Sequence, residues 1–214
     1  QSVLAADKKP LIADPIVEEA IRRVLKKPTG ELTKADLEKV TRLSLSRTKI
    51  TDAGLKEVAK LQKLIVLDLY DTKITDVGLK ELAKLQKLKG LTLSTTKITD
   101  VGLKEVAKLK QLTSLGLDGT QITDAGLKEV AKLQKLGYLG LGNAKITDAG
   151  LKEIAKMKQL TRLSLNRTQI TDAGLKEVAK MQNLTWLYLN NTQVTKAGVA
   201  ELQKALPKCR IVGP

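Results

Sequence analysis

Leucine recurs with a fixed period along most of this chain. The first leucine of a Leu-x-Leu pattern stands in register every 24 residues, at Leu43, Leu67, Leu91, Leu115, Leu139, Leu163 and Leu187. Around each of them apolar positions alternate with variable ones, which is typical of a short β-strand with one buried face. We therefore expect Leu67 and Leu69 to point into a core, and Asp68 and Tyr70 to point away from it.

A segment with helical spacing follows each predicted strand. In the first copy its core-facing positions are apolar: Leu55, Val58 and Ala59. The positions between them are charged, as on the exposed side of an amphipathic helix. The preceding Thr51-Asp52 pair, repeated in later copies, predicts side-chain caps for the helix start. Because one strand and one helix cannot bury their apolar faces alone, the seven copies predict a stacked solenoid.

This pattern resembles the leucine-rich repeat, Leu-x-x-Leu-x-Leu-x-x-(Asn/Cys/Thr)-x-Ile, and the resemblance extends from Val40 to about Val212. It implies an α/β fold: a right-handed solenoid of horseshoe shape, with a parallel β-sheet on the concave face and helices on the convex face. Where the family usually carries Asn or Cys, this chain carries Thr48, Thr72, Thr96, Thr120, Thr168 and Thr192. We interpret these as buried hydroxyls that satisfy loop backbone groups, a series interrupted by Ala144.

Both ends depart from the repeat. We divide the chain into an N-terminal helical cap (1–41), seven repeats (42–205) and a C-terminal capping strand (206–214). Asp14-Pro15 predicts the start of a cap helix, because proline is tolerated in the first turn. The stretch 21–40 is similar to the N-terminal caps of bacterial, internalin-like repeat proteins, which implies secretion or surface display. The chain starts at Gln1 without an initiator Met, which a removed secretion signal and a trimmed sequence explain equally well.

The C-terminal residues 206–211 are expected to shorten the last helix and to add a final strand. Cys209 would then point inward, and we interpret it as a core residue. As the single cysteine of the chain, it excludes an intramolecular disulfide and zinc sites of the CxxC type. No apolar run approaches the ~20 residues of a membrane helix, so we expect no membrane span.

The outward strand positions contain the candidate site. They change from copy to copy, whereas the helical half barely changes; random scatter after duplication is the alternative to selection by a partner. All four aromatic residues stand at these positions, and none of the 31 lysines does. Exposed Trp and Tyr are frequent contact anchors, and arginine is the recognition cation. Our candidate ligand-binding residues are Tyr70, Tyr138, Arg162, Arg167, Trp186 and Tyr188.

Tyr138, Arg162 and Trp186 occupy the same position of consecutive repeats, so we expect an aromatic–guanidinium–aromatic row. Such a row could also serve only to stabilise neighbouring strands. Beside it we expect a shallow trough formed by glycines, namely Gly116, Gly119, Gly140 and Gly142. The earlier repeats are more acidic, through Asp68, Asp71 and Asp118.

The sequence leaves four functions open. The first is a non-enzymatic, monomeric scaffold that binds a protein or peptide on the concave face, without cofactor or metal. The second is a binder of an anionic polymer, nucleic acid or acidic glycan, suggested by the net charge of +15. Nucleic acid is disfavoured because the lysines alternate with acidic residues, as on a solvated face. An enzyme is the weakest reading, because the chain has no His and no recognisable catalytic motif. A purely structural, self-associating module also stays open.

Overall fold

The computed structural model describes residues 9–214, so the first eight residues of the predicted cap lie outside it. One sheet of eight parallel strands runs in chain order from β1 to β8. The strands are β1 (Arg42–Ser44), β2 (Val66–Asp68), β3 (Gly90–Thr92), β4 (Ser114–Gly116), β5 (Tyr138–Gly140), β6 (Arg162–Ser164), β7 (Trp186–Tyr188) and β8 (Arg210–Val212). Every neighbouring pair is in the register set by the repeat, as in Leu67 opposite Leu91.

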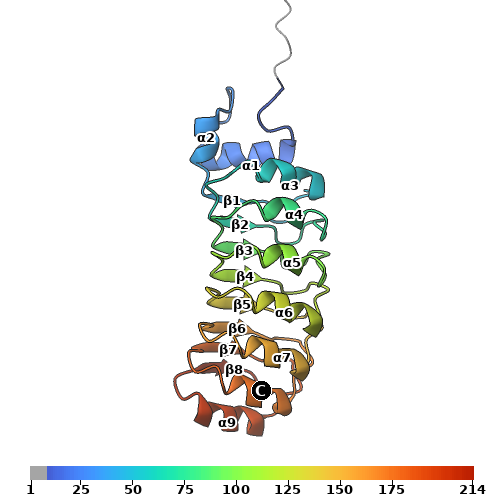
Figure 1. Cartoon of the computed structure of the whole chain (residues 1–214), viewed down its shortest axis with the longest axis vertical. Helices are drawn as coiled ribbons and strands as arrows, with labels where there is room; N and C mark the ends of the chain where they lie inside the picture. The colour runs from blue at the N-terminus through green and yellow to red at the C-terminus, as the bar shows by residue number, and fades with distance from the viewer. Residues whose placement is uncertain (1–8) are drawn as a thin grey trace, which may run out of the picture.

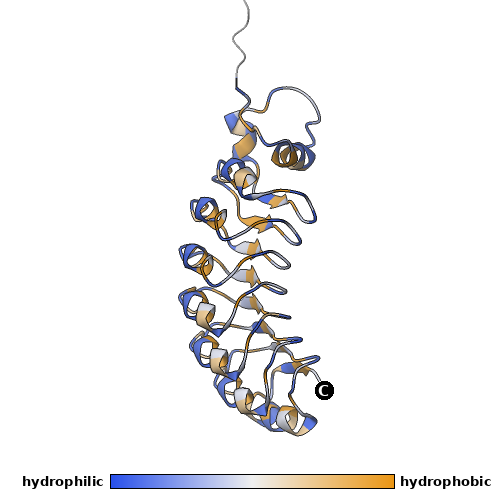
Figure 2. Cartoon of the chain, turned by 90° about the vertical axis from the view of Figure 1, so that its right-hand side faces the viewer, coloured by the Kyte–Doolittle hydropathy of each residue, from blue (hydrophilic) through white to orange (hydrophobic). Residues whose placement is uncertain are grey.

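The helices form a second layer beside the sheet (Figure 1). The cap contributes α1 (Pro15–Leu25) and α2 (Lys34–Glu38). The repeats contribute α3 (Asp52–Val58), α4 (Leu79–Leu82), α5 (Leu103–Val106), η1 (Asp124–Gly126), α6 (Leu127–Val130), α7 (Asp148–Ile154), α8 (Asp172–Val178) and α9 (Lys196–Ala205). Figure 2 shows that the stack bends, with the helices on its outer side. The predicted α/β solenoid is therefore confirmed.

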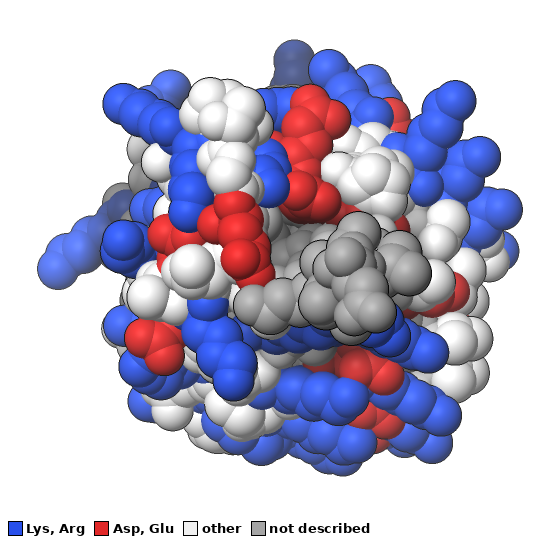
Figure 3. Space-filling view, turned by 90° about the horizontal axis from the view of Figure 1, so that it is seen from above, with Lys and Arg blue, Asp and Glu red and all other residues white. Residues whose placement is uncertain are grey.

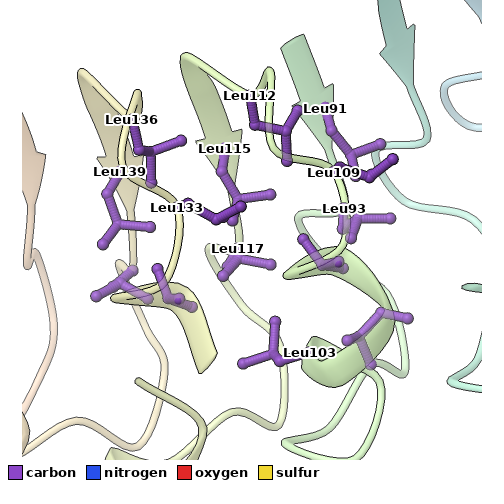
Figure 4. Close-up of a cluster of buried hydrophobic side chains, with 14 of the residues drawn as sticks. Leu91, Leu93, Leu103, Leu109, Leu112, Leu115, Leu117, Leu133, Leu136 and Leu139 are labelled. Atoms are coloured by element: carbon purple, nitrogen blue, oxygen red, sulfur yellow. The ribbon is translucent and has the colours of Figure 1, made fainter. Parts of the chain in front are cut away.

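The core is a continuous row of leucines between the two layers. Leu91, Leu115 and Leu139 from the strands meet Leu109 and Leu133, which follow the helices (Figure 4). Each of these side chains is at most 2% exposed. The alternation in the strands and the helical spacing thus converge on one interior, because each repeat buries its apolar face against its neighbours.

The recurrent Thr-Asp pairs do more than cap helices. The Asp124 carboxylate accepts hydrogen bonds from the backbone N–H and the hydroxyl of Thr147 in the next repeat. The same contact recurs from Asp52 to Asp172, always with the threonine 23 residues later. The threonines of the later repeats do cap locally, as Thr147 accepts from the Ala149 N–H at 3.3 Å. Thr51, where we predicted the first cap, makes no such bond. The prediction that the aspartates are caps was wrong, because they tie consecutive repeats together.

The threonines of the series satisfy loop backbone groups as predicted, and all are buried except the partly exposed Thr48 and Thr192 at its ends. The Thr120 hydroxyl donates to the Leu117 carbonyl at 2.7 Å, and the other five threonines make the same bond. Ala144 occupies the equivalent buried site without a hydroxyl. The threonines act one by one, each on its own turn, so they do not form a chain of hydroxyls.

The N-terminal cap is tied to the first repeat. Asp14 caps α1 by accepting from the Ile16 and Val17 N–H groups. The Ala13 N–H donates to Glu57 and the Lys60 ammonium donates to the Leu11 carbonyl, so chain before α1 is bonded to α3 and its end. With α1 packed on β1, the first edge of the sheet is covered.

The C-terminal end differs from expectation in one respect. Helix α9 has 10 residues, against 4 to 7 in α3–α8, so the last helix is lengthened and not shortened. Its C-cap, Leu206, lies outside the helical region at a φ of -122°, whereas α3–α8 each end on an alanine with helical angles. Cys209 is 3% exposed, which confirms it as a core residue. The final strand is short and lies between Pro207 and Pro214, features that discourage further strand pairing.

Candidate functional site

The sheet register aligns the predicted row of side chains. Tyr138 on β5 lies opposite Arg162 on β6, and Arg162 lies opposite Trp186 on β7. The same column continues to Arg210 on β8. Because the flanking leucines of each strand are buried, these side chains emerge from the other face of the sheet.

The Trp186 ring makes two contacts on this face. Its ring stacks on Tyr188, with centroids 6.2 Å apart and planes 18° apart. The guanidinium of Arg210 lies 4.7 Å from the Trp186 ring centroid. We expected Arg162 as the cation of this row, and the structure instead places Arg210 over Trp186. Sequence reasoning missed Arg210, although its position one residue before Ile211 matches Trp186 before Leu187.

Arg162 is exposed on this face, and no carboxylate of the described residues forms an ion pair with it. Its guanidinium contributes positive charge next to Tyr138. An unpaired guanidinium beside aromatic rings can donate two parallel hydrogen bonds to a carboxylate, or it can stack on a flat group. The C-terminal part of the face is therefore cationic and aromatic.

Tyr138 lies half-buried among charged neighbours. Burial raises its pKa, the Asp118 carboxylate and Tyr188 add to this, and Arg162 acts in the opposite direction. The Tyr138 hydroxyl and the Asp118 carboxylate converge over Gly140: a Cβ there would lie 2.8 Å from the hydroxyl and even closer to the carboxylate. Tyr138 is thus a neutral hydrogen-bonding group at neutral pH.

The structure shows the expected glycine trough in part. Gly119 and Gly142 line a polar groove, whereas Gly116 and Gly140 do not. Gly116, Gly140 and Gly142 are buried, while Gly119 is partly exposed. Asp118 reaches across the region, accepting from the Gly142 N–H at 2.8 Å and from the Ser94 hydroxyl at 3.3 Å. Over Gly140 the neighbouring side chains occupy the space of a Cβ, so the trough is filled there.

A polar groove of about 620 Å³ follows the edge of the sheet where the strands end. Tyr70 and Arg167 both line it, together with Asp118, Asn166 and Asn190. The Asn166 amide oxygen accepts from the Asn190 N–H at 2.8 Å, which leaves its NH₂ group for other partners. The six predicted residues therefore fall into two groups: Tyr138, Arg162, Trp186 and Tyr188 on the strands, and Tyr70 and Arg167 in the groove. Asp118 borders both.

Tyr70 stands apart from the C-terminal cluster. The Arg47 guanidinium lies 5.4 Å from its ring centroid, which is within the range of a cation–π contact. Arg167 has a backbone φ of 57°, in the left-handed region that favours Gly and Asn. Asn143 and Asn191 fill the same position of neighbouring repeats, and Arg47 fills it in the first. An arginine at this position costs backbone energy. This cost indicates that the arginine side chain has a role.

Among residues 9–214 no cluster of three or more Cys, Asp or Glu has the arrangement of a metal site. No helix in this part of the chain is long and apolar enough to cross a bilayer. The arrangement offers aromatic faces, guanidinium groups and amides, which are groups for binding.

Comparison with known proteins addresses the origin of this architecture. The family described as "Leucine-rich repeat region" matches residues 40–210. The chain belongs to the leucine-rich repeat family. The resemblance read from the sequence is thereby confirmed, and the comparison with curated proteins gives no match.

Two solved structures of this family are similar to the whole chain. An internalin C2 from Listeria monocytogenes shares 28% sequence identity at a TM-score of 0.69, with 95% of each chain covered. A second internalin from the same organism, inlF, shares 25% identity at a TM-score of 0.63, with 93% of this chain and 68% of the other covered. The internalin-like character predicted from the N-terminal cap agrees with these similarities.

Proposed function

We propose that this leucine-rich repeat protein is a non-enzymatic scaffold that binds a protein or peptide on the concave face of its sheet. The observation that carries the proposal is the packing around Trp186, whose ring contacts both Tyr188 and Arg210 while it stays partly exposed. A preordered aromatic side chain loses little conformational entropy on binding, and buried Trp, Tyr and Arg supply much of the energy of protein interfaces.

The binding site is centred on Arg162, Trp186 and Tyr188, with Tyr138 on one side. The groove with Tyr70 and Arg167 extends it along the sheet edge. Eight strands at ~4.8 Å spacing span roughly 34 Å, which suits an extended peptide or one face of a small domain. Unpaired Arg162 and Arg167 favour a ligand with acidic groups.

The chemistry of the face supports binding over catalysis. The sequence contains no His, and a tyrosine with a raised pKa is a poor base at neutral pH. The aspartates of the repeats are tied to threonines of the next repeat. Those carboxylates serve the stacking of the solenoid.

Peptides selected from a random displayed library on the immobilised protein would test the proposal. Their affinities would be measured by calorimetry for the wild type and for an Arg162/Trp186/Tyr188→Ala variant. We expect the variant to lose at least ~100-fold, since central interface residues cost about 2–4 kcal/mol when truncated. A Val77/Lys80/Val101→Ala variant on the outer, helical side is the matched control and should bind normally. Equal binding by both variants would contradict the site.

The internalin-like cap and the similarity to internalins support a secreted or cell-envelope protein. The short, proline-flanked β8 supports a monomer. Light scattering of the wild type and of Trp186→Ala checks the second point: assembly that depends on Trp186 would make the aromatic cluster a self-interface.

A further inference from the structure

Basic residues outnumber acidic ones in this chain, and the acidic residues are unevenly distributed over its surface. Seen from the N-terminal end, Lys and Arg surround the molecule with Asp and Glu between them (Figure 3). The turns from strand to helix each carry an aspartate, up to Asp172. The turns that lead from each helix back to the next strand carry no acid at all, namely 58–65, 82–89, 106–113, 130–137, 154–161 and 178–185. The turns on this edge of the repeats are therefore free of negative side chains, and Glu38 of the cap lies beside the first of them.

The lysines of this edge are of two kinds. One lysine per turn donates to the glutamate three residues before it, as Lys84 does to Glu81 at 2.6 Å. The remaining six make no ion pair with any described residue, and all are exposed: Lys63, Lys87, Lys89, Lys110, Lys135 and Lys158. We call these six the lysine edge. The glutamates of α3–α9 are already paired, and Glu38 of the cap lies beside Lys63 at one end of the row. Beyond Lys63 the charge of the lysine edge therefore stays unbalanced.

The repeat brings these lysines into a row. The Lys135 ammonium donates to the Gln111 amide oxygen at 2.7 Å, one repeat away, so equivalent positions stack. Lys63 and Lys87 come close enough that contact with the Lys63 ammonium lowers the pKa of Lys87. The spacing between neighbouring turns is larger than the ~4.8 Å between adjacent strands and smaller than the ~10 Å between packed helices. A polyanion crossing the repeats would relieve this like-charge crowding.

We propose that the lysine edge binds a linear polymer that carries phosphate groups and no bases. The row crosses the repeats, so it matches a chain of charges better than a single anion. Lysine is a flexible point charge without the geometric demands of arginine, which suits a polymer of variable conformation. None of the four aromatic residues stands in these turns, so bases would find no stacking platform on this edge. This surface is separate from the concave face.

Two charge-matched variants test the proposal. In the first, Lys63, Lys87, Lys110 and Lys135 are changed to Gln; glutamine already stands at the equivalent positions 111, 159, 62 and 86 of other repeats. In the second, Lys49, Lys73, Lys97 and Lys145 on the opposite edge are changed to Gln, which already stands at 121, 169 and 193. Each variant lowers the net charge of the protein by four, so the two variants differ only in the place from which the charges are removed. The probe is inorganic polyphosphate, and its dissociation constant is measured at several salt concentrations.

We expect the wild type to bind polyphosphate at physiological salt. The lysine-edge variant should bind at least ~10-fold more weakly, and the slope of log affinity against log salt should fall by about 3, the value for four lost contacts. The opposite-edge variant should keep most of the affinity and most of the salt slope. Equal losses in the two variants would mean a response to net charge alone, and no binding by the wild type would mean a merely solvated surface; either result overturns the proposal. Tighter binding of an oligothymidine of equal charge would overturn its base-free part. Trp186→Ala should leave polyphosphate binding unchanged, which separates this site from the concave one.

Discussion

Asp124 accepts two hydrogen bonds from Thr147 of the next repeat, one from the backbone N–H at 2.9 Å and one from the hydroxyl at 2.5 Å. The same carboxylate lies where a Cβ of Gly150 would stand. The aspartate, the threonine and the glycine of the Thr-Asp-x-Gly segment are therefore one device, built across two repeats. It joins the helical layer of each repeat to the next on the side where strands turn into helices.

Replacing Asp124 with Ala should lower the free energy of unfolding by about 2–3 kcal/mol, because two partly buried donors of Thr147 lose a charged acceptor. Asp124→Asn keeps one acceptor oxygen and should cost less. Urea denaturation followed by circular dichroism gives both values. Glu129→Gln, which breaks the exposed pair with Lys132, is the control and should change stability by under about 0.5 kcal/mol. A loss at Asp124 no larger than this control would contradict the device.

Ala144→Thr should raise the melting temperature. The new hydroxyl would donate to the Leu141 carbonyl, as Thr120 does to Leu117, and one such bond is worth about 1 kcal/mol. Ala144→Val has nearly the same shape without the hydroxyl. If the valine variant stabilises as much as the threonine variant, then packing and not the hydrogen bond is responsible.

The sequence predicted the fold and the register because both follow from a strict 24-residue period. Tyr138, Arg162 and Trp186 align for that reason alone. Reasoning from neighbouring residues failed where a partner lies one repeat away, as with Asp124 and Thr147. Side-chain direction was also out of reach: no pattern shows that Asp118 and Tyr138 reach over Gly140 and fill that part of the expected trough.

Arg210 was missed for a different reason. The last unit departs from the consensus, with Ile211 in place of leucine and a longer α9 before it. Arg210 was therefore not aligned with Trp186 and the equivalent residues of the earlier repeats. The candidate site itself stays a prediction. The contacts among Trp186, Tyr188 and Arg210 show how these side chains are arranged, and they do not identify a ligand.

The buried thiol of Cys209 should be inert in the folded protein. Burial raises its pKa to about 11, so only about a thousandth of it is thiolate at pH 8. A disulfide reagent added at pH 8 should react slowly with the native protein and rapidly after unfolding in urea. A native rate close to the unfolded one would show that β8 opens readily.

The N-terminal cap should lose stability in acid. A hydrogen bond from the Lys27 ammonium, followed by one from the Thr33 N–H, holds the pKa of Asp36 down to about 2. A folded-state pKa below the unfolded value of about 3.9 means that the stabilisation is complete above pH 4. It is lost as pH falls from about 4 towards 2. Thermal unfolding from pH 5 to 2 should therefore show a smaller acid-induced decrease for Asp36→Asn than for the wild type, and parallel curves would contradict the assignment.

Arg167→Asn should stabilise the fold and weaken the concave site at the same time. Arg167 is held at a φ of 57°, a conformation that asparagine adopts at lower cost, as Asn143 and Asn191 do in neighbouring repeats. We expect a gain of about 0.5–1 kcal/mol in urea denaturation, together with weaker binding of concave-face peptides, since the groove loses its guanidinium. Arg162→Asn is the control, because Arg162 lies in β6 with ordinary strand geometry and its replacement should bring no gain in stability. A destabilised Arg167→Asn variant would show that the guanidinium supports the fold itself, and the argument for a binding role at this strained position would then fail.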